Sequence, residues 1–189
     1  MAGCSRCFGL FVDINNNLYC SQRDSHQVVS KSLNSPANAL TIVAGTGCAG
    51  SDPNMLNIPY GIFVTINLDL YVADWGNDRI QLFRSGQLNA TTVAGNGSTG
   101  TISLNRPRGV VLDGDGYLFI VDGNNNRIVG SGPYGFRCLV GCSGLAGAAS
   151  NQLNIPWALS FDSDGNMFVA DRGNNRIQNF LVSNNSCGK

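Results

Sequence analysis

The fold is decided by the stretch Leu70-Tyr71-Val72-Ala73-Asp74-Trp75-Gly76-Asn77-Asp78-Arg79-Ile80, because the chain repeats it. Residues 118–128 and 167–177 carry the same pattern, each about 50 residues further along. Residues 18–28 align with the stretch without a gap but have diverged more. A supersecondary unit that is copied in tandem indicates a repeat architecture, in which each unit packs against its neighbours.

Each copy lies between other short apolar runs. The segment Leu-Asn-x-Pro opens a unit at 56–59, 104–107 and 153–156, and a run that ends in glycine closes it at 41–45, 91–95 and 137–141. The runs are rich in Val, Ile, Phe and Tyr and are separated by Gly, Asn and Asp, which is typical of strands joined by tight turns. We expect the third residue of the repeated turn to adopt a left-handed backbone. This residue is Asp24, Gly76, Asn124 or Gly173.

Four antiparallel strands in a unit of this length match one blade of a β-propeller. The sequence therefore predicts an all-β fold, with a single propeller region over residues 1–189. The blades are expected at approximately 8–45, 56–95, 104–141 and 153–182. The last unit lacks the closing run, so the last blade is expected to be incomplete.

Composition and charge exclude several classes of protein. Twelve Lys and Arg residues balance twelve Asp and Glu residues, and 13% of the 189 residues are charged. This balance argues against strong electrostatic attraction to nucleic acid or to an anionic membrane. No apolar run is long enough to span a bilayer, so membrane insertion is not expected.

The cysteines and glycosylation motifs bear on the cellular compartment. Seven cysteines and three Asn-x-Ser/Thr sequons favour an extracellular or secretory location, with N-glycosylation expected at Asn89, Asn96 and Asn184. The N-terminus lacks the charged and then uninterrupted apolar stretch of a signal peptide, which keeps a cytoplasmic location as the alternative.

The spacing of the cysteines predicts their roles. We expect a local disulfide between Cys138 and Cys142, whereas Cys20 falls within a predicted strand and is expected to be a small buried core residue. The pair Cys4 and Cys7 lies too far around the propeller from Cys138 and Cys142 to share a zinc ion with them. An odd number of cysteines leaves at least one without a partner in the chain.

Asp and Arg recur at fixed positions of the repeated turn. The pairs are Asp74 with Arg79, Asp122 with Arg127 and Asp171 with Arg176. A catalytic centre needs one asymmetric cluster, so residues that recur in several blades are predicted to hold the turn, the carboxylate accepting backbone N–H groups. The first unit has Gln22 and Gln27 at these positions, and its blade is predicted to be the least stable.

The other polar motifs are also assigned to structure. Asp113-Gly-Asp-Gly and Asp162-Ser-Asp-Gly begin like calcium loops but lack the later ligands, so they are predicted to be hairpin turns. His26 is the only histidine, which excludes a metal centre built from several imidazoles. We therefore expect no catalytic residue, no metal site and no cofactor.

The repeat Asp-x-Gly-Asn-x-Arg-Ile, preceded by Leu-Tyr-Val-Ala and by Pro-x-Gly-Val, resembles the NHL repeat, and the resemblance covers nearly the whole chain. It implies propellers that generally have six blades, so 189 residues are too few for the usual ring. Three interpretations follow: a fragment of a longer propeller, a compact four-bladed ring, or an open arc that associates with another chain. The fragment is favoured, and further blades or another chain are expected to close the ring.

The predicted function is non-catalytic binding, in which a scaffold propeller recognises a protein, or else a glycan, through its blade loops. Trp75, Arg172 and Trp157 are the candidate binding residues, because the loops differ between units while the scaffold stays constant.

The resemblance also implies two alternatives. One is a fragment of a metal-dependent enzyme similar to the peptide-amidating lyase, although His26 does not match that family's metal-ligating histidines. The other is the NHL domain of a RING-type ubiquitin ligase that binds RNA or protein. The chain lacks the basic face that such RNA binding needs, so no nucleic acid partner is expected.

Overall fold

The computed structural model describes residues 6–36 and 39–181 and confirms an all-β fold of four small antiparallel sheets, arranged as the blades of a β-propeller. Blade 1 contains β1 (Cys7–Val12), β2 (Asn17–Gln22), β3 (Gln27–Ser32) and β4 (Thr41–Gly45). Blade 2 contains β5 (Pro59–Val64), β6 (Leu70–Asp74), β7 (Arg79–Phe83) and β8 (Thr91–Gly95). Blade 3 contains β9 (Pro107–Leu112), β10 (Leu118–Asp122), β11 (Arg127–Gly130) and β12 (Arg137–Val140). Blade 4 contains β13 (Pro156–Phe161), β14 (Met167–Asp171) and β15 (Arg176–Phe180).

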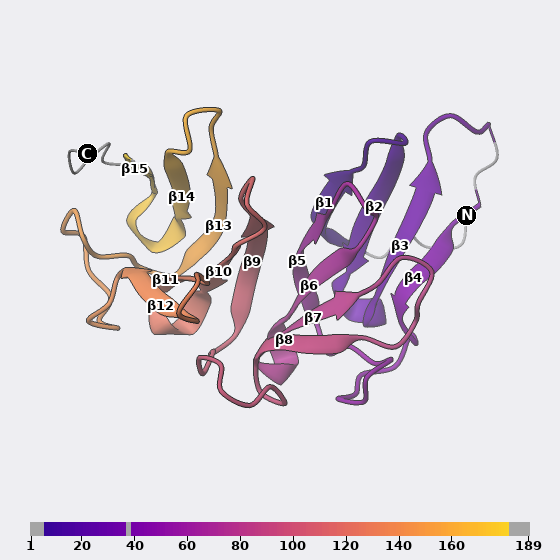
Figure 1. Cartoon of the computed structure of the whole chain (residues 1–189), viewed down its shortest axis with the longest axis horizontal. Helices are drawn as coiled ribbons and strands as arrows, with labels where there is room; N and C mark the ends of the chain where they lie inside the picture. The colour runs from indigo at the N-terminus through magenta and orange to yellow at the C-terminus, as the bar shows by residue number, and fades with distance from the viewer. Residues whose placement is uncertain (1–5, 37–38, 182–189) are drawn as a thin grey trace.

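Within each blade the strands follow one another in chain order, so every blade is an antiparallel meander. The first strand of each blade is innermost: β1 packs against β5, β5 against β9, and β9 against β13. Figure 1 shows the sheets one after another, with blade 1 and blade 4 at opposite ends of the molecule. Among the described residues, no helix is long and apolar enough to cross a membrane.

The turn between the second and third strands contains a short 3-10 helix: η1 (Arg23–Ser25), η2 (Trp75–Asn77), η3 (Gly123–Asn125) or η4 (Arg172–Asn174). The expectation that the third residue of the turn is left-handed is wrong. The left-handed residue is the fifth, at His26, Asp78, Asn126 and Asn175. Gly76 has a different role, because a Cβ atom there would lie 2.5 Å from the Asn57 side chain. Glycine therefore provides close packing at this position rather than left-handed backbone.

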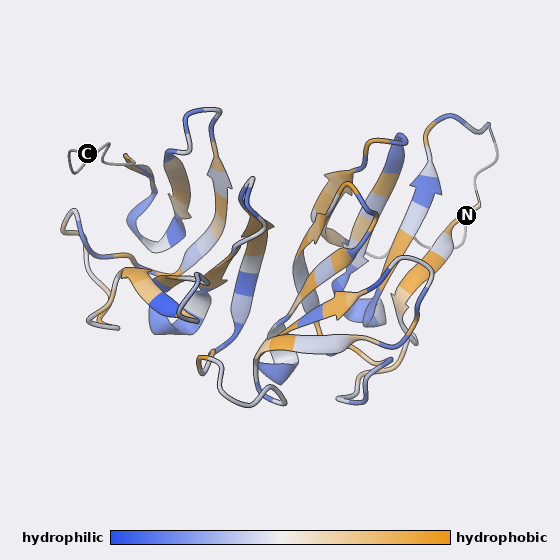
Figure 2. Ribbon diagram, viewed as in Figure 1, coloured by the Kyte–Doolittle hydropathy of each residue, from blue (hydrophilic) through white to orange (hydrophobic). Residues whose placement is uncertain are grey.

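Apolar side chains from consecutive blades interdigitate to form the core. Figure 2 shows hydrophobic residues concentrated on the strands, with hydrophilic residues at the turns and in many loops. Ile80 in blade 2 and Ile128 in blade 3 are fully buried against the following blade, but Ile177, their equivalent in blade 4, is 67% exposed. At the other end Leu10 is 62% exposed, whereas its equivalent Ile62 is buried. The outer faces of the two terminal blades thus carry core-type residues without a neighbouring blade.

The described residues contain two disulfides. Cys138 is bonded to Cys142, as expected, and Cys7 is bonded to Cys20. Cys20 is buried as predicted but is not a free core residue, because the pairing of β1 with β2 brings the two Cα atoms within 5.3 Å. Cys48 is free and exposed, while Cys4 and Cys187 lie outside the described residues.

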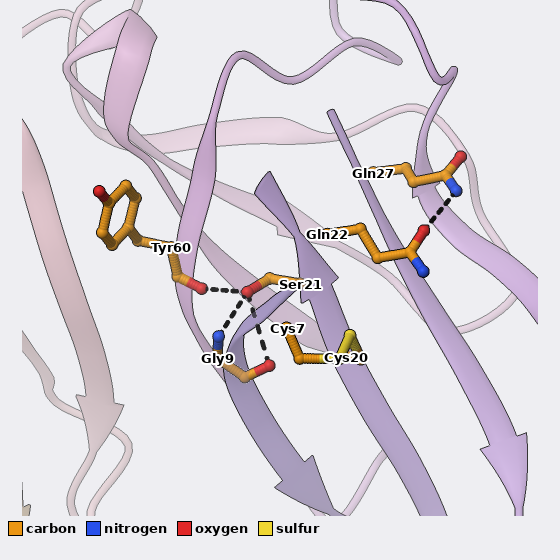
Figure 3. Close-up of a disulfide and its surroundings, with 7 residues drawn as sticks. All are labelled: Cys7, Gly9, Cys20, Ser21, Gln22, Gln27 and Tyr60. Atoms are coloured by element: carbon orange, nitrogen blue, oxygen red, sulfur yellow. Dashed lines mark hydrogen bonds between the residues drawn. A yellow bond between two sulfur atoms is a disulfide. The ribbon is translucent and has the colours of Figure 1, made fainter. Parts of the chain in front are cut away.

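A buried serine beside the first disulfide joins the first two blades. Ser21 Oγ accepts a hydrogen bond from the Gly9 amide at 2.7 Å and donates to the Tyr60 carbonyl at 2.5 Å. A Cβ atom on Gly9 would lie 2.5 Å from that carbonyl, so glycine is needed where β1 approaches β5. Figure 3 shows these contacts, together with a hydrogen bond of 2.7 Å from the Gln27 amide to Gln22.

Candidate ligand-binding site

The recurring Asp and Arg side chains pair within each of blades 2, 3 and 4. Arg Nε lies 2.7–2.8 Å from the carboxylate in all three pairs, and each carboxylate is fully buried. Each carboxylate also accepts the backbone N–H of the Leu-Asn-x-Pro asparagine at 2.7 Å. In blade 2 the remaining Arg79 N–H groups donate to the carbonyls of Ser51, Asp52 and Met55. The pairs use their hydrogen-bonding capacity within the protein, which favours a structural role.

The pKa of the repeat aspartate shifts in opposite directions in blades 2 and 4, because the two blades differ in burial. Burial raises the pKa of Asp74, although hydrogen bonds from the Asn57 amide, Asn77 and Arg79 act in the opposite direction. Burial also acts to raise the pKa of Asp171, but there the equivalent hydrogen bonds outweigh it, so that pKa is lowered. The arginine partner in blade 4, Arg176, is 30% exposed, against 8% for Arg79.

In blades 1, 2 and 3 the left-handed residue at the end of the turn links its blade to the next. His26 Nδ1 accepts the Ile58 backbone N–H at 3.1 Å, placing the histidine in a junction between blades 1 and 2. The Asp78 carboxylate accepts the backbone N–H of Arg106 at 2.7 Å, and the Asn126 side-chain carbonyl accepts the backbone N–H of Ile155 at 2.9 Å. The three acceptors are chemically different but occupy one repeat position, so this position requires an acceptor rather than a particular side chain.

The segments that begin at Asp113 and Asp162, predicted to be hairpin turns, are turns in the structure. Asp113 Oδ1 accepts the backbone N–H of Asp115 and Tyr117, and Asp162 makes the equivalent bonds within its own turn. Within residues 6–36 and 39–181, no group of three or more His, Cys, Asp or Glu side chains is placed to hold a metal ion.

Two repeat positions break the pattern, and both lie at the same end of the sheets. One is the second residue of the innermost strand, occupied by Phe8, Tyr60, Arg108 and Trp157. The other is the first residue of the 3-10 turn, occupied by Arg23, Trp75, Gly123 and Arg172. Together with Arg106, from the loop before β9, the aromatic and arginine residues at these positions form what we call the mouth cluster.

Tyr60 is the centre of the mouth cluster. Its ring lies 5.1 Å from Phe8, 5.7 Å from Trp75 in a stacked arrangement, and 5.5 Å from Trp157 in an edge-on arrangement. The guanidinium of Arg172 lies over the Trp157 ring at 5.1 Å. The three candidates Trp75, Trp157 and Arg172, which come from two different blades, are therefore brought together through a tyrosine that sequence reasoning did not single out.

Arginines surround these rings. Arg106 lies over Trp75 at 4.3 Å, and Arg108 lies over Trp157 at 5.2 Å. Burial lowers the pKa of Arg108; the neighbouring Tyr60 acts in the opposite direction, and the charges of Arg172 and Arg106 add to the lowering. Sequence reasoning missed Arg108 too. Tyr60 and Arg108 could have been recognised from their position. Each follows the proline of Leu-Asn-x-Pro, where the residue type changes from blade to blade.

A glycine makes room for Arg108. A Cβ atom on Gly123 would lie 2.9 Å from Arg108 Nη1 and 2.9 Å from the Arg106 carbonyl. Blade 3 thus has no side chain at the position that carries Arg23, Trp75 or Arg172 in the other blades, and the Arg108 side chain extends across that place. There its Nη2 donates to Asn124 at 3.2 Å.

The mouth cluster borders a cavity between the innermost strands of all four blades. The cavity has a volume of 420 Å³, and Phe8, Tyr60, Arg108 and Trp157 each line it. This volume lies within the range of small-ligand pockets, and the lining combines rings with a few polar groups, as such pockets do. The arrangement can hold a ligand by stacking and by hydrogen bonds from guanidinium groups.

Comparisons with known proteins support the repeat assignment. Residues 153–180 match the family model of the NHL repeat. A search of curated proteins finds no match. A crystal structure of a protein of unknown function from Bacteroides thetaiotaomicron VPI-5482 has a TM-score of 0.73 at 14% identity, covering 90% of this chain and 46% of that one.

Two further solved structures share the fold. Virginiamycin B lyase from Staphylococcus aureus has a TM-score of 0.63 at 12% identity, covering 99% of this chain and 59% of that one. A chain of a nidogen–laminin complex has a TM-score of 0.61 at 20% identity, covering 92% of this chain and 64% of that one. The chain spans about half the length of the first structures that it matches, and at these identities the likeness shows the fold alone.

Proposed function

We propose, from the premise that this chain is an NHL-repeat β-propeller, that it is a non-catalytic binding module and recognises a protein ligand through the mouth cluster. The observation that carries the proposal is the convergence of Trp75 and Trp157 on Tyr60 at one end of the propeller, with Arg172 lying over the Trp157 ring. These positions vary while the scaffold around them repeats. Tyr, Trp and Arg are the residue types that most often dominate the energy of protein interfaces.

The fold itself does not choose between binding and catalysis, because the similar structures include a lyase and a chain of a protein–protein complex. The arrangement of side chains favours binding. The carboxylates of the repeat are engaged in turns, and His26 is engaged at a junction between blades. The lyase-like alternative needs a metal site, and titration with Zn²⁺ or Ca²⁺ followed by calorimetry tests it. Stoichiometric binding of either ion would favour the enzyme.

An extracellular location is part of the proposal. Two disulfides are consistent with an oxidising compartment, and the sequon residues Asn89 and Asn96 are exposed, while Asn184 lies outside the described residues. Expression through a secretory pathway followed by native mass spectrometry tests this. We expect glycans at Asn89 and Asn96 and both disulfides, and a reduced, unglycosylated chain would contradict the location.

Selection from a phage-displayed random peptide library tests protein recognition directly. The library is selected in parallel on the wild-type chain, on Trp157→Ala and on Tyr134→Ala, which removes an exposed aromatic ring from a loop between β11 and β12. We expect peptide families that bind the wild type and Tyr134→Ala but not Trp157→Ala. Families that ignore the Trp157 substitution, or no enrichment at all, would overturn the proposal.

A further inference from the structure

The mouth cluster contains four arginines, of which Arg23 lies 3.9 Å from the Asp24 carboxylate, while Arg106, Arg108 and Arg172 form no ion pair in the described part of the chain. Arg79, Arg127 and Arg176 each pair with a buried carboxylate. By contrast, no carboxylate among the described residues lies within ion-pairing distance of Arg106, Arg108 or Arg172. These three side chains are close enough for Arg106 and Arg172 to disfavour the charged form of Arg108. An anion placed among them would reverse that repulsion.

Donors in the cluster also lack acceptors. Arg108 Nε and Trp75 Nε1 are withdrawn from solvent and have no hydrogen-bond partner among the described residues. Buried donors are normally satisfied, and an unsatisfied one costs free energy that an incoming acceptor recovers. A carboxylate supplies only acceptors, carries the complementary charge and matches the planar fork of a guanidinium.

Gly123 supports the same interpretation. A side chain at this position would displace Arg108 from its place over Trp157, so the glycine keeps the guanidinium beside the ring. The rings of Phe8, Tyr60 and Trp157 border the same cavity and offer an apolar surface next to the charge. The cluster therefore fits a ligand in which a carboxylate adjoins an aromatic or apolar group.

The distribution of charge favours a peptide over a nucleic acid. A single strand of RNA is bound along a basic groove that follows many phosphates. This chain has a net charge of zero. Among the described arginines without an ion-pair partner, Arg106, Arg108 and Arg172 gather at the mouth cluster, while Arg137 lies apart on β12, so the unpaired charge does not follow a track.

We propose that the mouth cluster binds an acidic peptide segment of its protein partner, with a Glu or Asp carboxylate held by Arg108 and Arg172 and a neighbouring aromatic side chain packed against Tyr60 and Trp157. This inference rests on the proposed function and specifies its ligand.

The experiment uses the two tryptophans of the chain, Trp75 and Trp157, both of which belong to the cluster, so intrinsic fluorescence reports on this site. The probe is the capped peptide Gly-Glu-Phe-Glu-Gly, titrated against the full chain beside its counterpart with glutamine in place of glutamate. We expect the glutamate peptide to bind at least about tenfold more tightly, because hydrogen bonds between charged groups are the stronger ones.

Matched variants locate the charge. Arg172→Gln should weaken the glutamate peptide by roughly tenfold and leave the glutamine peptide unchanged, because the lost contact is specific to the carboxylate. Arg137→Gln, an exposed arginine on the outermost strand β12, should change neither. Gly123→Ala should weaken the glutamate peptide by displacing Arg108. Far-UV circular dichroism checks that each variant is folded.

Several outcomes would overturn the inference. They are equal binding of the two peptides, no binding of the glutamate peptide, equal effects of Arg172→Gln and Arg137→Gln, or tighter binding of oligouridylate than of the glutamate peptide. If the peptide library yields neutral sequences that depend on Trp157, the binding function stands and the acidic ligand is wrong. If no sequence depends on Trp157, both fail.

Discussion

Ile128 and Ile177 occupy one position of the repeat but differ in burial, and alanine substitution should expose that difference. Ile128 is fully buried between blades 3 and 4, whereas Ile177 is 67% exposed. Isoleucine to alanine removes three methyl or methylene groups, or about 2.4 kcal/mol of transfer free energy at full burial. At Ile128 a cavity adds to this, so the free energy of unfolding should fall by about 2–5 kcal/mol. At Ile177 only about a third of the side chain is withdrawn from water, so the loss should be about 0.8 kcal/mol.

Urea unfolding followed by circular dichroism measures both losses, and the difference between them is the quantity of interest. It should exceed about 1 kcal/mol when taken from the difference in urea midpoints at equal m-value. Equal losses for Ile128→Ala and Ile177→Ala would refute the reasoning, because Ile177 would then be covered as completely as Ile128. Measurements at two protein concentrations would show whether a second copy provides that cover.

Three further predictions concern the turns and junctions. Asp122→Ala should lower the free energy of unfolding by about 3 kcal/mol, because it leaves the Arg127 guanidinium without its carboxylate partner. Gln22→Ala should lower it by about 1 kcal/mol. Equal losses in chemical denaturation would contradict this prediction. Burial and the hydrogen bond to Asp13 raise the pKa of Tyr19 from 10.0 to about 12. The contribution of Tyr19 to the free energy of unfolding should therefore be fully present below pH 10 and be lost between pH 10 and pH 12. Tyr19→Phe should reduce that loss, leaving a smaller one from Tyr71, whose pKa burial also raises, and a loss of unchanged size in this variant would assign it elsewhere. His26→Asn should preserve the hydrogen bond to the Ile58 backbone N–H, whereas His26→Leu should lower the free energy of unfolding by about 1 kcal/mol. Equal thermal stability of the two variants would rule out the acceptor role.

Periodicity and turn chemistry were sufficient to predict the propeller, because each blade repeats the same alternation of apolar runs and turn residues. They misplaced the left-handed residue of the turn, since Gly76 indicates conformational freedom but is needed for close packing against Asn57. The bond between Cys7 and Cys20 depends on strand register, which residue types alone do not specify.

The candidate site was predicted in part. Trp75 and Arg172 stood out as large or charged residues in predicted loops, whereas Trp157, also expected in a loop, lies on strand β13. Tyr60 and Arg108 resembled ordinary strand residues, because their role comes from the way neighbouring blades bring their side chains together. Sequence reasoning works within one repeat, whereas the mouth cluster is formed between repeats.

The junctions between blades bear on how this architecture tolerates sequence change. The same repeat position accepts a backbone N–H of the next blade through the imidazole of His26, the carboxylate of Asp78 or the amide of Asn126. Such a junction requires a hydrogen-bond acceptor, so the residue type can change while the geometry stays the same. The family model matches residues 153–180, and the chain shares its fold with a structure that is 14% identical. Duplicated blades can therefore diverge at their rims and acquire separate ligands without losing the joints that align them.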